Sequence, residues 1–226
     1  MITANVIHRV FRIQWQGVEG TAFTIDVQDR QYLVTARHVV HDLRAPSEIG
    51  VFSNGLWIPL PVRLVGHCPG DIDISVLATS RILTSADLTM EPTSEGVIYG
   101  QDVYFLGFPY GLLGRCVFGP DGFPLPFVKR ATVSLFDGAI LYLDGNNNLG
   151  FSGGPVVFTE PQSNRYKVAA VISGFKRVDQ PVYKGSDRTD DLTYQYNTGI
   201  IVTHAIGGAL KLIEENPIGF ELKGAT

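Results

Sequence analysis

The chain has few charged residues and no long hydrophobic run, and each shortage excludes a class of protein. Charged residues make up 18% of the 226 residues, the net charge is −4, and no run of lysine or arginine is present. Such a chain lacks the basic surface that would follow a nucleic-acid backbone or an anionic lipid surface. No segment approaches the roughly 20 apolar residues of a membrane-spanning helix. We therefore expect no nucleic-acid partner and no membrane association.

Cysteine is also scarce, since Cys68 and Cys116 are the only two. Two cysteines are too few for a disulfide framework, and they lack the paired spacing of a zinc site. The N-terminus alternates polar and apolar residues and carries no secretion signal. The expected location is therefore the cytoplasm, where thiols stay reduced.

Hydrophobic residues are plentiful at 45%, and they recur in short runs that are typical of β-strands. A first set of runs lies at about residues 6–15, 21–27, 31–35, 49–53, 56–65 and 72–78. The "SNG" at 53–55 predicts a hairpin turn between two of these runs, since asparagine and glycine tolerate positive φ. A polar stretch at 79–100 separates these runs from a second set, at about residues 102–108, 127–136, 139–143, 155–159, 166–174 and 198–203. A single amphipathic helix is predicted over 205–215, where one apolar stripe is followed by Pro217.

These runs predict an all-β fold of two six-stranded antiparallel barrels with a C-terminal helix, because closing each sheet removes its exposed edges. We expect the first barrel to span residues 1–85. The second barrel, the helix and the tail are expected to span residues 86–226.

The candidate chemistry centres on "GFSGGP" at residues 150–155, which places Ser152 among glycines. A serine hydroxyl is a weak nucleophile unless a base removes its proton and a third group orients that base. His38 in "YLVTARHVV" follows an apolar strand, and Asp73 in "DIDISVL" opens another. Asp71 lies two residues earlier on the same strand face and is the alternative acid.

Together, "TARHVV", "DISVL" and "GFSGGP" resemble the three signatures of the chymotrypsin-like, or trypsin-like, serine proteases, in that family's order of histidine, aspartate and serine. The segment "DVYFLGFPYG" at 102–111 resembles the opening strand of the second barrel in bacterial members of the HtrA kind. The resemblance implies a serine endopeptidase that forms an acyl-enzyme on protein or peptide substrates and needs no cofactor or metal. His38 would be the base, Asp73 its orienting acid and Ser152 the nucleophile.

The resemblance also implies an oxyanion hole formed by the backbone amides of Gly150 and Ser152. Glycine at 150 can adopt the backbone angles that this role needs. The substrate pocket would be lined by five residues at matching positions: Asn146, Ser173, Gly174, Phe175 and Gly199. Because Asn146 is neutral, we expect a small or medium uncharged residue before the cleaved bond, unless the loop shifts register and brings Asp144 to the pocket base.

Two departures from the secreted members of the family are visible. The residue after the histidine is Val39 rather than a disulfide-bonded cysteine. The residue before the serine is Phe151 rather than an aspartate, so activation by a newly freed N-terminus is not expected.

Other chemistries fit the sequence less well. "GFSGG" also satisfies the nucleophile elbow of α/β-hydrolases, with Asp190 or Asp191 and then His204 in that order, but Pro155 and a strand follow the serine where an elbow needs a helix. A metal site would draw on His38, His41, His67 and Cys68, yet adjacent strand residues point to opposite faces. A protease-like binding or regulatory module without turnover and a serine esterase stay as alternatives.

Overall fold

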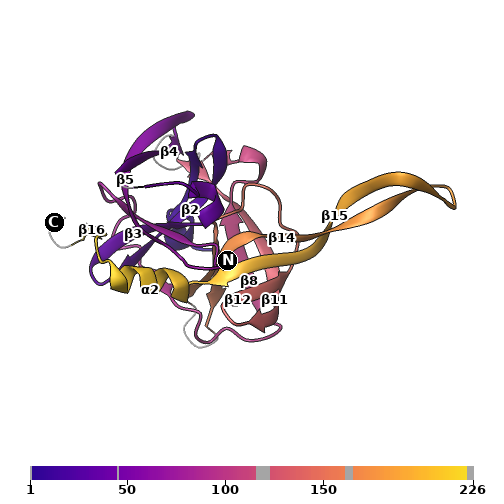
Figure 1. The fold of residues 1–226 in the computed structure, drawn as a ribbon. Coiled ribbons are helices and arrows are strands. Elements are labelled where there is room, and N and C mark those ends of the chain that lie inside the picture. Colours follow the sequence, from indigo (N-terminus) through magenta and orange to yellow (C-terminus); the bar gives the residue numbers. More distant parts are fainter. Residues whose placement is uncertain (1, 45, 116–122, 161–164, 223–226) are drawn as a thin grey trace.

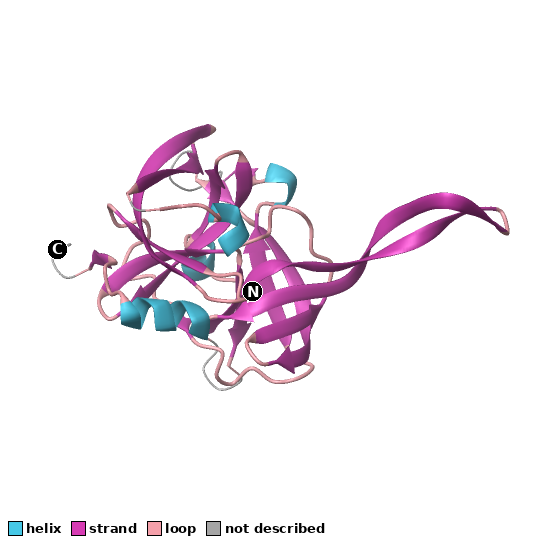
Figure 2. Ribbon diagram, viewed as in Figure 1, coloured by secondary structure: helices cyan, strands magenta, loops and turns pink. Residues whose placement is uncertain are grey.

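The computed structural model describes residues 2–44, 46–115, 123–160 and 165–222. Cys116 lies outside the described residues. Two seven-stranded sheets make up most of the molecule, and one helix follows the last long strand (Figures 1 and 2). The predicted all-β fold is thus confirmed.

The first sheet closes into an antiparallel barrel because β3 pairs with both β2 and β6. Its strands are β1 (Val10–Trp15), β2 (Val18–Val27), β3 (Arg30–Thr35), β4 (Ser47–Ser53), β5 (Leu56–His67) and β6 (Ser75–Thr79). The short C-terminal strand β16 (Phe220–Glu221) adds to β3. The turn predicted at 53–55 joins β4 to β5, with Asn54 and Gly55 both at positive φ.

The second sheet closes in the same way, because β13 pairs with both β8 and β14. Its long strands are β8 (Asp102–Gly107), β11 (Phe127–Asp137), β12 (Ile140–Asp144), β13 (Pro155–Thr159), β14 (Tyr166–Lys184) and β15 (Asp187–Ala205). The short strand β7 (Glu91–Pro92) runs parallel to β14, and β9 (Gly114–Arg115) pairs only with β10 (Pro124–Leu125) in the described chain.

Four short helical segments complete the fold: α1 (Ala4–Ile7), η1 (Arg37–Val40), η2 (Pro109–Gly111) and α2 (Gly207–Glu215). Residues 6–9, predicted as the start of the first strand, lie in α1 and the turn after it, since so short an apolar run fits either period. The stripe predicted for α2 is buried at Ala209 and Ile213. The helix packs on β5 and β6 of the first barrel, where Leu212 lies over Gly66.

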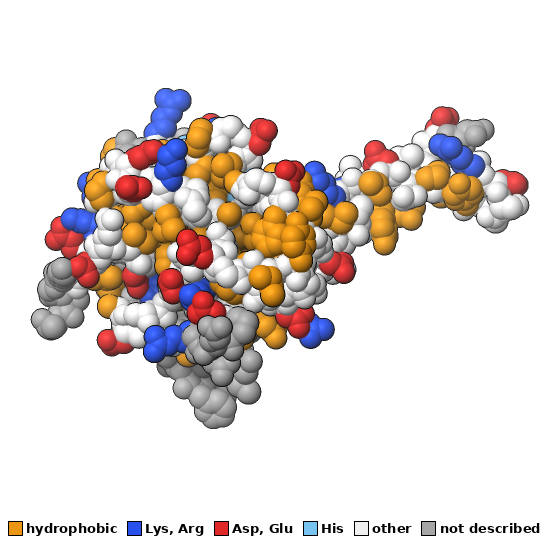
Figure 3. Space-filling view, turned by 90° about the horizontal axis from the view of Figure 1, so that it is seen from below, with side chains coloured by type: hydrophobic (Ala, Val, Ile, Leu, Met, Phe, Trp, Pro, Cys, Tyr) orange, Lys and Arg blue, Asp and Glu red, His pale blue; other side chains and the backbone are white. Residues whose placement is uncertain are grey.

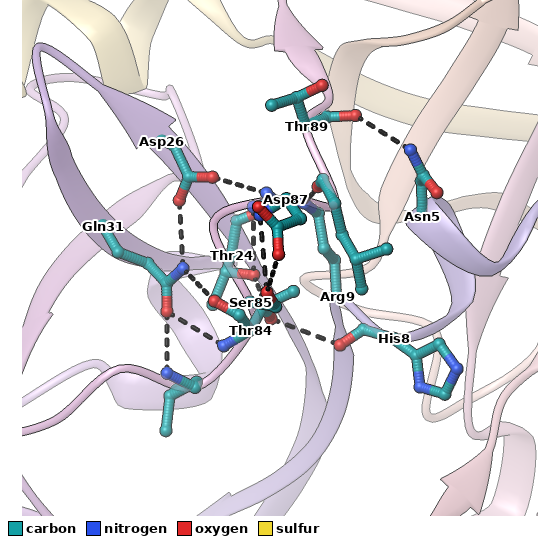
Figure 4. Close-up of polar contacts among 12 residues, drawn as sticks. Asn5, His8, Arg9, Thr24, Asp26, Gln31, Thr84, Ser85, Asp87 and Thr89 are labelled. Carbon is teal, nitrogen blue, oxygen red and sulfur yellow. Dashed lines mark hydrogen bonds and ion pairs between the residues drawn. The ribbon is translucent and has the colours of Figure 1, made fainter. Parts of the chain in front are cut away.

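The connection between the barrels is fastened by a buried polar network (Figure 4). The Arg9 guanidinium is fully buried, pairs with Asp26 at 2.5 Å and donates from Nε to the Leu88 carbonyl. The Gln31 side chain bonds Asp26 and both the N–H and the carbonyl of Thr84. Because each buried polar group has a partner, the network fixes the course of the chain where it leaves the first barrel.

The feature that the sequence did not predict is a long hairpin arm, which we define as residues 177–197. Beyond the pairing of Arg177 with Asn197, β14 and β15 bond only to each other among the described residues. The arm extends from the second barrel into solvent as a two-stranded ribbon (Figures 1 and 2). The predicted strands had ended at 174 and resumed at 198.

Candidate active site

His38 and Asp73 form the most tightly bonded pair of the site. His38 lies in η1 directly after β3, and Asp73 lies in the loop before β6. Nδ1 of His38 is 2.6 Å from Oδ2 of Asp73, and the His38 backbone N–H donates to Oδ1 at 2.9 Å. The hydrogen bond to Asp73 holds the imidazole proton on Nδ1, so Nε2 of the neutral ring is the acceptor. The exposed Asp71 is not part of this pairing.

The surroundings of Asp73 keep it ionised. Burial would raise the pKa of this carboxyl, but the hydrogen bonds and charge of His38 and the hydrogen bond from Ser173 hold the pKa below its usual value. The Ser173 hydroxyl donates to Asp73 Oδ2 at 2.6 Å. The carboxylate thus accepts three hydrogen bonds and can stabilise a positive charge on His38.

Ser152 and His38 both line a cleft of about 420 Å³. Its hydroxyl donates to the carbonyl oxygen of Ser173 at 3.1 Å, and among the described residues it makes no hydrogen bond with His38. The His38 side chain is 49% exposed, so its ring is open to the cleft from the solvent side. The structure therefore brings His38 and Ser152 to one cleft, with Asp73 bonded to His38 outside the cleft lining and the serine hydroxyl turned toward β14.

Two unpaired backbone amides flank the nucleophile. In the part of the chain that the structure describes, the N–H groups of Gly150 and Ser152 donate to no protein acceptor. Gly150 has φ +102, and a Cβ at this position would overlap the carbonyl oxygen of Phe108. Only glycine therefore fits here, and free amides are what an oxyanion site requires.

The loop that carries Ser152 is held from both barrels. Phe151 is fully buried and packs edge-on against Phe105 at a ring distance of 4.9 Å. From the first barrel, the Thr21 hydroxyl donates to the Gly150 carbonyl at 2.7 Å, and the Thr21 N–H donates to the Ser152 carbonyl at 2.8 Å. Phe151 thus anchors the loop through the core.

The walls of the cleft differ in part from the predicted pocket. Its remaining lining consists of the residue sets 147–149 and 173–177. Ser173, Gly174 and Phe175 are among them, whereas Asn146 and Gly199 are not. Asn146 is exposed on the outer side of the loop, because it is the next residue, Asn147, that is buried and donates to the Gly174 carbonyl at 3.1 Å.

Two residues that shape this wall were missed from the sequence. Asn147 is buried, and its carbonyl oxygen accepts a hydrogen bond from Asn197 at 2.8 Å. Lys129 of β11 donates to the Asn146 carbonyl and to Asn148 Oδ1, each at 2.7 Å, and burial lowers its pKa. The run of three asparagines was a visible signal, but nothing in the pattern linked Lys129 to it.

Gly199 and Asp144 lie close to each other behind this wall. The Gly145 N–H donates to the Gly199 carbonyl at 2.9 Å, and Asp144 pairs with Ile200 on β15. Asp144 is exposed and does not line the cleft. In the described part of the chain, the lining of the cleft therefore contains no carboxylate.

The residues of the rejected alternatives lie elsewhere. His204 is buried in β15, and burial lowers its pKa despite the opposing effect of Asp73. Asp191 lies on the arm, and β13 follows Ser152, so the nucleophile-elbow alternative is wrong. His67 bonds Ser75 at 2.6 Å, and burial raises the pKa of Cys68 to about 11.

Within the described ranges, no three residues among His, Cys, Asp and Glu are grouped so as to hold a metal ion. The described helices include none that is long and apolar enough to cross a membrane. A larger hollow of about 800 Å³ lies between α1 and the start of β14, and none of the predicted site residues lines it.

The family model for the trypsin-like peptidase domain matches residues 20–162. An inactive serine-to-alanine mutant of Rv3671c from M. tuberculosis H37Rv is similar with a TM-score of 0.55 and 19% identity, over 95% of this chain and 89% of that one. The HtrA-type protease AlgW, solved with a tripeptide, is similar with a TM-score of 0.57 and 18% identity, over 94% of this chain.

The chain spans 61% of the AlgW chain. At these identities the likeness to solved structures concerns the fold. A search of curated proteins gave no significant match.

Proposed function

The chain belongs to the trypsin-like peptidase family, and from that premise we propose that it is a serine endopeptidase with His38, Asp73 and Ser152 as its catalytic residues. The observation that carries the proposal is that His38 is hydrogen-bonded to Asp73 and lines one cleft with Ser152. This arrangement joins a base, the group that orients it and a nucleophile on a loop that both barrels hold.

The reaction follows from the positions of the protons. The Ser152 hydroxyl gives its proton to His38 Nε2 as Oγ attacks the carbonyl carbon of the scissile peptide. The N–H groups of Gly150 and Ser152 stabilise the negative charge that develops on the carbonyl oxygen. His38 then gives the proton to the leaving amine, and an acyl-enzyme forms on Oγ. Water, deprotonated by His38, releases the acid product and restores the serine.

One movement precedes the attack. The Ser152 hydroxyl donates to the Ser173 carbonyl and has to turn toward His38. The hydrogen bond is neutral and 3.1 Å long, so its loss costs about 1 kcal/mol. Rotation of a half-buried side chain is fast compared with turnover.

The cleft favours an uncharged residue before the cleaved bond. The described residues of its walls include no carboxylate, and Lys176 and Arg177 are among them. A substrate lysine or arginine would lose water there without gaining a counter-charge. We therefore propose that cleavage after basic residues is disfavoured.

A fluorophosphonate probe tests the proposal directly, because it reacts with activated serine hydroxyls. We expect the wild-type chain to be labelled and to cleave denatured casein, and Ser152→Ala to do neither. The change removes one oxygen from a half-buried side chain and should leave the fold intact, which circular dichroism would check.

Each contrary result has a distinct meaning. Equal labelling of Ser152→Ala would exclude Ser152 as the nucleophile. A labelled chain that hydrolyses acetyl esters but no polypeptide would be a serine esterase. A folded chain that binds casein without labelling or cleavage would be a protease-like binding module.

A further inference from the structure

The hairpin arm is amphipathic. Residues opposite each other in an antiparallel pair point to the same face, and Val178 pairs with Tyr196 while Gln180 pairs with Tyr194. By alternation along β15, Leu192 lies on this face too. We call Val178, Leu192, Tyr194 and Tyr196 the apolar face of the arm.

The opposite face of the arm is mostly polar. It carries Asp179, Thr193 and Gln195, with Pro181 opposite Thr193, and the same alternation places Arg177 and Asn197 with them. Such alternation is typical of a ribbon with one covered face. Among the described residues nothing covers the apolar face, since its four side chains are between 42 and 60% exposed. Figure 3 shows hydrophobic side chains recurring along the arm.

A two-stranded ribbon alone in water is only marginally stable. Over the length in which it has no other strand beside it, the arm presents five large apolar side chains to solvent, because Tyr183 is exposed as well as the four of the apolar face. An exposed aromatic stripe of this kind marks a surface that binds another polypeptide. The position of the arm's first residues, next to the cleft, decides between a substrate chain and a second copy of the protein as the partner.

The arm starts at the active-site cleft. Ser173, whose carbonyl accepts the Ser152 hydroxyl, opens the stretch of β14 that leads into it, and Lys176 and Arg177 line the cleft at its root. Among the described residues, β13 pairs with β14 only up to Val171, so one edge of β14 has no strand beside it from Ser173 outward. An extended chain that leaves the cleft on this side meets that free edge and the apolar face.

We propose that the arm is a second docking site for the substrate, which holds an extended apolar segment of an unfolded polypeptide while a more distant peptide bond lies at Ser152. The proposal rests on the proposed function. The occupant is an unfolded chain because only such a chain offers a free edge for strand addition together with exposed apolar side chains. Continuity with the cleft favours the substrate over a second copy of the protein.

The geometry sets a length for the substrate. Gln180, opposite Tyr194, is seven residues beyond Ser173, which is about 23 Å at roughly 3.3 Å per residue. A peptide must therefore continue about six to eight residues from the cleaved bond on one side to reach the two tyrosines. A tetrapeptide cannot reach them.

The test compares two double variants on two substrates. Tyr194→Ser with Tyr196→Ser alters the apolar face, and Thr193→Ser with Gln195→Ser alters the polar face of the same strand as the matched control. The long substrate is denatured casein, and the short one is a fluorogenic tetrapeptide built on a casein cleavage site. We expect the tyrosine variant to raise KM for casein about tenfold, as loss of interface aromatic residues does, with kcat, tetrapeptide hydrolysis and fluorophosphonate labelling unchanged. The control should stay within about twofold of wild type throughout.

Three results would overturn the proposal. If the tyrosine variant lost activity equally on casein and on the tetrapeptide, the arm would be a structural support of the cleft. If it lost activity on neither, the arm would not bind the substrate. A wild-type dimer in sedimentation that the tyrosine variant dissociates would make a second copy the occupant.

Failure of the proposed function is distinguished by the labelling result. If the wild-type chain is not labelled, binding of fluorescent casein to Ser152→Ala, with and without the tyrosine changes, still measures the arm. Binding that is weakened about tenfold by the tyrosine changes would support docking of unfolded chains there, and unaltered binding would refute it.

Discussion

Replacing Gly150 by alanine tests whether its N–H stabilises the oxyanion of the reaction. A Cβ at this position would overlap the Phe108 carbonyl oxygen and lie 3.1 Å from the Tyr110 nitrogen, and the residue has φ +102. The Phe108 contact is with backbone, so the new methyl group cannot be accommodated by a side-chain rotation. The Gly150 peptide has to turn instead, and its N–H turns with it.

Loss of one oxyanion donor lowers kcat by about 10²- to 10³-fold, or roughly 3–4 kcal/mol of transition-state stabilisation. We expect a loss of this size for Gly150→Ala, measured as kcat on a tetrapeptide and as the rate of fluorophosphonate labelling. KM should change little, because the ground-state carbonyl uses the site weakly.

The matched control is Gly138→Ala in the turn between β11 and β12. Gly138 also has positive φ, at +58, but a Cβ there meets nothing within 4 Å. In this variant alanine is strained by the positive φ but its Cβ does not overlap any neighbouring atom, so kcat should stay at the wild-type value. If Gly150→Ala, correctly folded, retained kcat within about threefold of wild type, the Gly150 amide would not be part of an oxyanion site.

Three further predictions concern Asp73, Phe151 and the buried His204. Asp73→Asn should lower kcat about 10⁴-fold without unfolding the protein, because an amide cannot hold the proton on His38 Nδ1; near-normal turnover would remove Asp73 from the proposed triad. Phe151→Ala should lower the free energy of unfolding by about 3–5 kcal/mol, since Phe151 is fully buried beside the nucleophile, and a loss under 1 kcal/mol in urea titration would contradict its role as an anchor. Burial lowers the pKa of His204 in the folded state, so below about pH 6.5 the unfolded chain binds more protons and stability falls as the pH falls; this fall should be shallower in His204→Gln, and identical curves would exclude His204 as a source.

The strand pattern could be predicted because alternation and turn residues are local signals. Asn54 and Gly55 adopt positive φ in the turn between β4 and β5, as the sequence indicated. The choice of Asp73 rather than Asp71 as the partner of His38 could also be predicted from the sequence. The residues after Asp73 form the buried strand, which places its carboxylate beside the end of β3 and His38.

Details of the cleft depend on contacts that no local pattern encodes. Within the run of three asparagines, Asn147 rather than Asn146 is buried, because its amide reaches the Gly174 carbonyl on β14. Lys129 fixes the same loop from β11 and is 17 residues away from the carbonyl that it bonds. Such pairings are set by how the strands close into a barrel, which the spacing of the strands does not specify.

The arm was missed for a different physical reason. Its residues alternate between apolar and polar, so the local signal for strands was present in "DLTYQYN". The predicted fold consisted of closed barrels with short strands, so strands of 19 residues were not expected. A ribbon that extends beyond its barrel buries no further apolar surface in the isolated chain. Because the apolar stripe is exposed in the isolated chain, the arm, and not the cleft alone, is where we expect substrate length to be sensed.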